Sequence, residues 1–237
     1  MHARFSALIG AAVAICAASA GSLAAQSAGP VVVELYTAQG CAACPPADAY
    51  FAELAGRDDL IALALHVDYW DYLGWADPFA RPGHTARQKS YARAIGAKMI
   101  YTPQLIIEGA ERIEGLQTAV IDEQITRHGA ESGPVTLHLE RAGKMVRIAA
   151  DTAAPLARAL MVQMVRYRPA ETMTIERGEN AGHTATYHNI VTQWDALGEW
   201  TGEAPLSIEA RAEGEDPVVV ILQEPGPGPI VAAARLR

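Results

Sequence analysis

In the first half of the chain, apolar residues occur either in continuous runs or at helical spacing. The runs Val31–Tyr36 and Leu60–Val67 predict strands that are buried on both faces. Apolar residues three and four positions apart predict helices at Pro45–Ala55, His84–Ile95 and Leu116–His128. A Glu-Gly turn predicts a hairpin with strands Gln104–Ile107 and Ala110–Ile113. This order predicts an α/β fold, a mixed four-stranded sheet with flanking helices.

After Pro134 the apolar positions alternate with polar ones, as in strands that bury one face. The alternation begins at Val135. Further strands are predicted at Met145–Ile148, Ala159–Tyr167, Thr184–Thr192, Leu206–Ala210, Val218–Gln223 and Pro229–Ala234, with a short helix or turn at Asp195–Trp200. The small residues from Gly129 to Pro134 predict a linker. We therefore expect two domains, the α/β domain at 30–130 and an all-β antiparallel sandwich-like domain at 134–237.

The first residues have the pattern of an export signal. Arg4 precedes an uncharged, alanine-rich stretch that ends in small residues such as Ser22 and Ala24. We expect residues 1–25 to be a cleaved signal peptide, with a retained membrane anchor as the alternative. A secreted or periplasmic location follows, with no stable membrane insertion after cleavage.

Composition narrows the function classes. Half of the residues are hydrophobic, which argues against a disordered chain. The chain has 19 Lys and Arg against 27 Asp and Glu, for a formal charge of −8. Because a nucleic-acid binder needs basic residues to neutralise phosphates, this balance predicts no nucleic-acid partner.

Two cysteines remain after signal removal, Cys41 and Cys44, and they lie between the first strand and the first helix. A bond between residues three positions apart closes a very short loop and removes little chain entropy. The helix start behind them supplies unpaired N–H groups that favour thiolate. The pattern therefore favours a chemical role for the pair over a structural one. Since Pro45 and Pro46 fit a first helical turn, we expect the helix to begin at Pro45.

A second motif, Tyr101-Thr102-Pro103-Gln104, directly precedes the third strand. Together with Cys-x-x-Cys at the first helix and the order of elements between them, it makes residues 31–128 resemble the thioredoxin superfamily. The resemblance implies that the Thr102-Pro103 loop lies against the cysteine pair and that its backbone pairs with the substrate as an added strand.

A closer resemblance spans nearly the whole mature chain. It rests on residues 34–48 and 66–75, on the Tyr101-Thr102-Pro103-Gln104 motif, on Arg177-Gly178-Glu179-Asn180 and on Gly226-Pro227-Gly228-Pro229. These segments resemble an uncharacterised family of secreted bacterial thioredoxin-like proteins, a domain family of unknown function. The resemblance implies the fold and an exported location, but no substrate.

An aromatic and acidic insert, from Tyr69 to Phe79, follows His66 at the end of the second strand. Sheet topology brings this strand end to the same edge as Cys41. The insert, which includes Trp70, is either a lid that faces the substrate or a packed loop. His66 is either a proton carrier or metal ligand, or a histidine packed in the core. The cations Arg87, Lys89 and Arg93 favour a solvated helix face.

The sequence thus predicts a secreted thiol–disulfide oxidoreductase without a cofactor. Cys41 attacks a disulfide, Cys44 resolves the mixed disulfide, and Thr102, Pro103 and Trp70 bind the substrate. The expected partners are a protein, peptide or small disulfide and a redox partner. One alternative is a Cu(I)-binding protein that uses both thiolates and His66, since soft sulfur ligands suit that ion. The other is a non-catalytic interaction scaffold.

Overall fold

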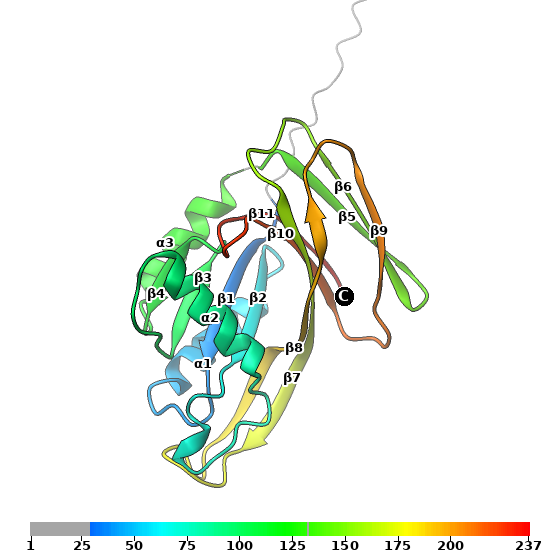
Figure 1. The fold of residues 1–237 in the computed structure, drawn as a ribbon. Helices are drawn as coiled ribbons and strands as arrows, with labels where there is room; N and C mark the ends of the chain where they lie inside the picture. The colour runs from blue at the N-terminus through cyan, green and yellow to red at the C-terminus, as the bar shows by residue number, and fades with distance from the viewer. Residues whose placement is uncertain (1–28, 132) are drawn as a thin grey trace, which may run out of the picture.

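The computed structural model describes residues 29–131 and 133–237 (Figure 1), so the predicted signal peptide lies outside the described residues. The helical elements are α1 (Pro45–Ala55), the 3-10 helix η1 (Asp71–Leu73), α2 (Pro82–Ala94) and α3 (Thr118–Gly129). The strands are β1 (Val31–Thr37), β2 (Leu60–His66), β3 (Gln104–Ile107), β4 (Glu111–Glu114), β5 (Val135–Ala142), β6 (Met145–Thr152), β7 (Leu160–Thr174), β8 (Thr184–Trp200), β9 (Leu206–Arg211), β10 (Val218–Gln223) and β11 (Ile230–Leu236).

The main sheet is mixed and has eight strands, in the order β11-β10-β7-β8-β2-β1-β3-β4. The expected four-stranded sheet is therefore only one side of it, and that part of the prediction is wrong. The parallel bridge between Ala64 and Ile190 joins β2 to β8 and continues the sheet into the second half of the chain. Periodicity could not reveal this bridge, because a buried strand has the same pattern beside any neighbour.

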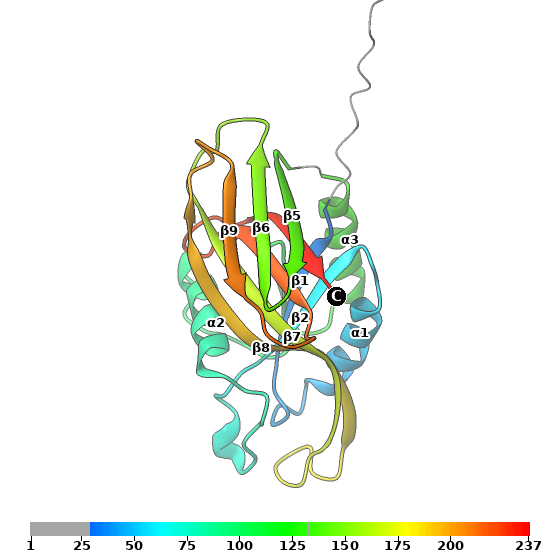
Figure 2. The same ribbon diagram turned by 90° about the vertical axis from the view of Figure 1, so that its right-hand side faces the viewer.

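Strands β5, β6 and β9 form a second, antiparallel sheet. It packs against β7 and β10 (Figure 2). Val146 and Ile148 belong to the core between the two sheets, which includes Val162, Val220 and Trp200. Residues 195–200 belong to β8, so the expected short helix or turn is wrong. Strands from both halves share the main sheet, and the division into domains at 30–130 and 134–237 stays a prediction.

Helices cover both faces of the sheet around β1. On one face, Val33 and Leu35 pack with residues of α1 and α3; on the other, Val32 and Tyr36 pack with Tyr91 of α2. Alternate side chains of a strand point to opposite faces, so β1 is buried on both and its carboxyl end is firmly placed. That end carries the loop with the two cysteines.

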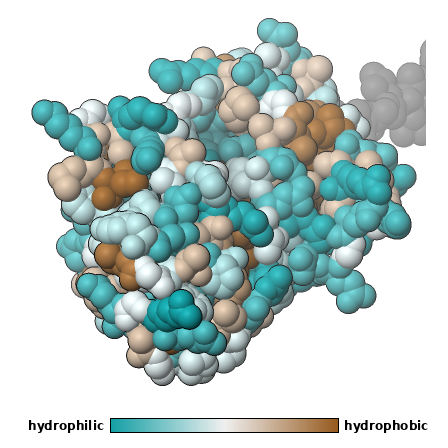
Figure 3. Space-filling view, turned by 60° about the horizontal axis from the view of Figure 1, so that its bottom comes forward, coloured by the Kyte–Doolittle hydropathy of each residue, from teal (hydrophilic) through white to brown (hydrophobic). Residues whose placement is uncertain are grey.

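No helix among the described residues is long and apolar enough to cross a membrane. The end of the molecule that carries the cysteine loop is largely hydrophilic, with separate hydrophobic spots rather than one continuous patch (Figure 3).

Candidate functional site: the Cys41–Cys44 pair

Cys41 and Cys44 form a disulfide at the start of α1, with their Cα atoms 5.4 Å apart. Cys44 is the N-cap and the helix begins at Pro45, as predicted. The Cys44 N–H donates to the Cys41 carbonyl at 3.1 Å, which closes the turn. Cys41 is 2% exposed and Cys44 is fully buried, so Cys41 is the slightly more exposed residue of the two.

The Thr102-Pro103 loop lies against this pair. Its peptide bond is cis, and the Thr102 carbonyl oxygen lies 3.6 Å from Cys41 Sγ. Trp70 Nε1 donates to Thr102 Oγ1 at 2.6 Å. The Trp70 side chain also lies over Gly40, where a Cβ atom would come within 3.2 Å of the Trp70 Cβ. The structure therefore brings all five predicted site residues together, while their roles stay predictions.

His66 lies in the interior rather than at the surface of the site. Its Nδ1 pairs with Asp77 Oδ2 at 2.7 Å, and its ring contacts Phe79 and Tyr187 edge-on. Burial opposes the charge of Asp77, but His66 and two backbone N–H donors outweigh it and hold the pKa of Asp77 below its usual value. These contacts favour a packed core histidine.

Among residues 29–131 and 133–237, no group of three or more His, Cys, Asp or Glu side chains is placed to hold a metal ion. No contact of His66 favours the Cu(I) alternative, which stays a prediction, as does the scaffold alternative.

A carboxyl group, Asp48, lies within the first turn of α1 behind the cysteines. Its Oδ1 accepts a hydrogen bond from Thr37 Oγ1 at 2.7 Å. Burial raises the pKa of Asp48 from 3.8 to about 7, against the opposing effects of His66 and of the Thr37 hydroxyl. The sequence indicates an acidic residue in the first helical turn, but not that it faces inward.

The raised pKa of Asp48 predicts a pH-dependent stability. Folding favours the protonated form of the Asp48 carboxyl group. The contribution of this group to the free energy of unfolding is therefore full below pH 4 and is lost as pH rises towards 7. The variant Asp48→Asn should nearly match the wild type at pH 4 and be roughly 4 kcal/mol more stable at pH 8. Urea denaturation at both pH values measures this. With the exposed Glu123→Gln as control, an equal Asp48→Asn effect at the two pH values would contradict the assignment.

The second half of the chain also contributes to the site. Asn180, in the loop between β7 and β8, donates from Nδ2 to the carbonyl oxygens of Gln39 and Cys41, each at 2.9 Å. This loop lies beside the η1 segment in both ribbon views (Figures 1 and 2). The sequence singled out Arg177-Gly178-Glu179-Asn180 only as part of a family resemblance and did not predict this contact. Its only signal was the resemblance that extended to these residues.

The solvated-face interpretation is wrong for Arg87, whose side chain is only 12% exposed. Its guanidinium binds both carboxylate oxygens of the buried Glu34, at 2.7 and 2.8 Å, and lies 3.9 Å from the ring centroid of Trp194. Helix α2 therefore places the Arg87 cation against the Glu34 carboxylate on β1. Periodicity cannot show this, because the partner is 53 residues away.

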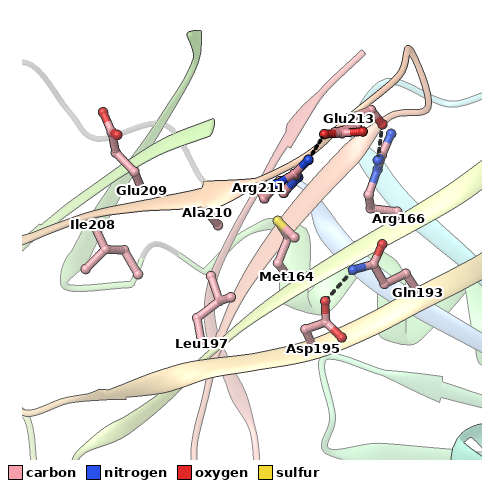
Figure 4. A pocket seen from close by; sticks show the side chains of 10 residues that line it. All are labelled: Met164, Arg166, Gln193, Asp195, Leu197, Ile208, Glu209, Ala210, Arg211 and Glu213. Carbon is pink, nitrogen blue, oxygen red and sulfur yellow. Dashed lines mark hydrogen bonds and ion pairs between the residues drawn. The ribbon is translucent and has the colours of Figure 1, made fainter. Parts of the chain in front are cut away.

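A groove of about 600 Å³ lies away from this site, between β8 and β9 (Figure 4). It is lined by residues of the second half of the chain, including Met164, Leu197 and Ile208. None of the five predicted site residues lines it. The groove is therefore separate from the cysteine pair.

Comparison with known proteins gives a family and two similar solved structures. The model of the family described as "Protein of unknown function (DUF1223)" matches residues 32–223. The X-ray structure of protein AGR_C_4864 from Agrobacterium tumefaciens is 31% identical, with 90% of this chain and 96% of that chain covered and a TM-score of 0.76. HBP35 of Porphyromonas gingivalis is 16% identical, with 88% and 74% covered and a TM-score of 0.64, a likeness of fold alone. None of the curated proteins matches. The chain belongs to the DUF1223 family.

Proposed function

We propose that this protein is an exported thiol–disulfide oxidoreductase with a thioredoxin-like N-terminal half. The observation that carries the proposal is the position of the Cys41–Cys44 disulfide against the Thr102-Pro103 loop, with Cys41 Sγ 3.6 Å from the Thr102 carbonyl oxygen. A structural bond gains little from a loop this short. The cysteine pair lies at a helix start, which favours the thiolate form, and the backbone of the Thr102-Pro103 loop lies beside it. This arrangement suits exchange with a peptide disulfide.

The proposed reaction proceeds in two exchanges. The Cys41 thiolate attacks one sulfur of a substrate disulfide, and the other substrate sulfur leaves as a thiolate. The Cys44 thiolate then attacks Cys41 Sγ and releases the second substrate sulfur, so the substrate gains two electrons and the pair becomes a disulfide. A separate thiol partner reverses this oxidation in a reductive cycle, and the same steps in reverse describe an oxidase.

Thr102, Pro103 and Trp70 would hold the substrate chain during these steps. Trp70 donates to the Thr102 side chain, so the Thr102 carbonyl beside Cys41 is kept in place. No cofactor is needed, because electrons pass between sulfur atoms. The substrate class is a protein, peptide or small disulfide, and the location is secreted or periplasmic.

Catalysis of insulin reduction by dithiothreitol tests this function. The wild type should accelerate the precipitation of reduced insulin chains, because it exchanges disulfides faster than the small thiol alone. The double variant Cys41→Ser, Cys44→Ser should leave only the uncatalysed rate. Equal rates for the two proteins would remove the proposed activity for protein substrates.

A further inference from the structure

The loop 175–183 between β7 and β8 holds the cysteine loop through one side chain. The Asn180 amide nitrogen Nδ2 carries two hydrogens and donates to two carbonyl oxygens, those of Gln39 and Cys41, each 2.9 Å from Nδ2. These partners lie about 140 residues away in the chain, with separations of 141 and 139. The contact is therefore a tertiary clamp on the segment that leads into the disulfide.

The clamp is itself well held. The His183 N–H donates to the Asn180 carbonyl at 3.0 Å, and the Ile175 N–H donates to the His183 carbonyl at 2.9 Å. Gly178 has φ +82° and lies so near the insert that a Cβ atom would come within 3.5 Å of the Trp75 Cβ. Asn180 thus reaches the cysteine loop from a loop that is closed by its own backbone hydrogen bonds and contacts the insert.

The Cys41 carbonyl accepts two hydrogen bonds, from the Cys44 N–H at 3.1 Å and from Asn180 at 2.9 Å. The first bond defines the turn between the cysteines, and the second fixes the residue at which that turn begins. A turn held in this way keeps the two sulfurs near each other after reduction. Nearby groups react as if at high concentration, so the clamp favours closure of the disulfide.

We propose that Asn180 is a positioning residue that sets the redox equilibrium of the Cys41–Cys44 pair. This inference rests on the proposed function, and it places part of the redox control in the second half of the chain. Removing the clamp should shift the equilibrium from the disulfide towards the two thiols. The reason is that the reduced loop gains conformational freedom, which closure of the disulfide must then remove.

Equilibration with glutathione tests the proposal. Reduced protein and oxidised glutathione give oxidised protein and two reduced glutathione molecules, so the two cysteines lose two protons and two electrons to the glutathione disulfide. The variant Asn180→Ala should lower this equilibrium constant about tenfold, the effect expected when closure of the disulfide must fix the backbone of about one further residue. The variant Asn180→Asp keeps the size but has no donor, and should lower it at least as much.

Asn189→Gly is the matched control. Asn189 lies on β8 and donates to the Ala62 carbonyl at 2.9 Å, and glycine tolerates its φ of +46°. This variant should lose stability to urea but keep the wild-type equilibrium constant within about twofold.

The outcomes separate the two proposals. Wild-type protein that does not exchange with glutathione overturns the proposed function. Wild-type exchange with an unchanged constant in folded Asn180→Ala and Asn180→Asp overturns the role of Asn180 alone. An equal shift in Asn189→Gly also overturns it, since general loss of stability would then explain the effect.

Discussion

The variant Arg87→Ala is expected to lose about 3–5 kcal/mol of unfolding free energy, because it leaves the buried Glu34 carboxylate without its cation. Glu34 is fully buried on β1, and the hydroxyls of Tyr36 and Tyr91 donate to it at 2.8 Å each. Burial opposes the charge of Arg87, but the Glu34 carboxylate outweighs it and holds the pKa of Arg87 above its usual value. The two hydroxyls cannot replace a full positive charge.

Urea denaturation of the oxidised protein at neutral pH measures this loss. Arg93→Ala is the control on the same helix, since Arg93 is exposed and its side chain bonds only to Ser90 among the described residues. This variant should change stability by less than about 0.5 kcal/mol. Adding Glu34→Gln to Arg87→Ala should recover part of the loss, because it removes the unpaired charge. A loss below about 1 kcal/mol for Arg87→Ala would contradict this account of the pair.

The same polar network connects the two halves of the chain. Arg87 also donates to Gln223 Oε1 on β10 at 3.0 Å, and Trp194 on β8 donates to Gln163 of β7 at 2.8 Å. The next residue of α2, Gln88, donates to the Tyr101 carbonyl at 2.7 Å. The helix that carries Arg87 therefore also supports the loop that lies against Cys41.

Local patterns predicted the elements around the cysteines well. The continuous run that begins at Val31 is a strand buried on both faces, and the prolines after Cys44 mark the helix start. Each of these features depends on residues that are close in sequence, so spacing and proline chemistry suffice.

Long-range contacts could not be predicted in the same way. The bridge from Ala64 to Ile190 and the pairing of Glu34 with Arg87 join residues far apart in the chain. Asn180 lies in a polar loop whose composition is that of any turn, and its amide is significant only because the fold brings it to Cys41. The local spacing of apolar and polar residues in a single sequence does not show which distant residues come into contact.

The variant Cys44→Ser is expected to accumulate a mixed disulfide with its substrate. In the proposed exchange Cys44 resolves the bond between Cys41 and the substrate, and a serine hydroxyl cannot take its place. Cys41→Ser should accumulate at least about tenfold less adduct, because the remaining Cys44 thiol is fully buried. The wild type should release substrate and show no stable adduct.

Peptide mapping of this trapped adduct is the most direct test of a redox pair with Cys41 as the attacking thiol. Each reduced protein is mixed with insulin, quenched with acid, digested without reductant and analysed by mass spectrometry. The account predicts an insulin peptide disulfide-linked to Cys41 in Cys44→Ser, and little adduct in Cys41→Ser. Adduct chiefly on Cys44 in Cys41→Ser, or none in either variant, would contradict it.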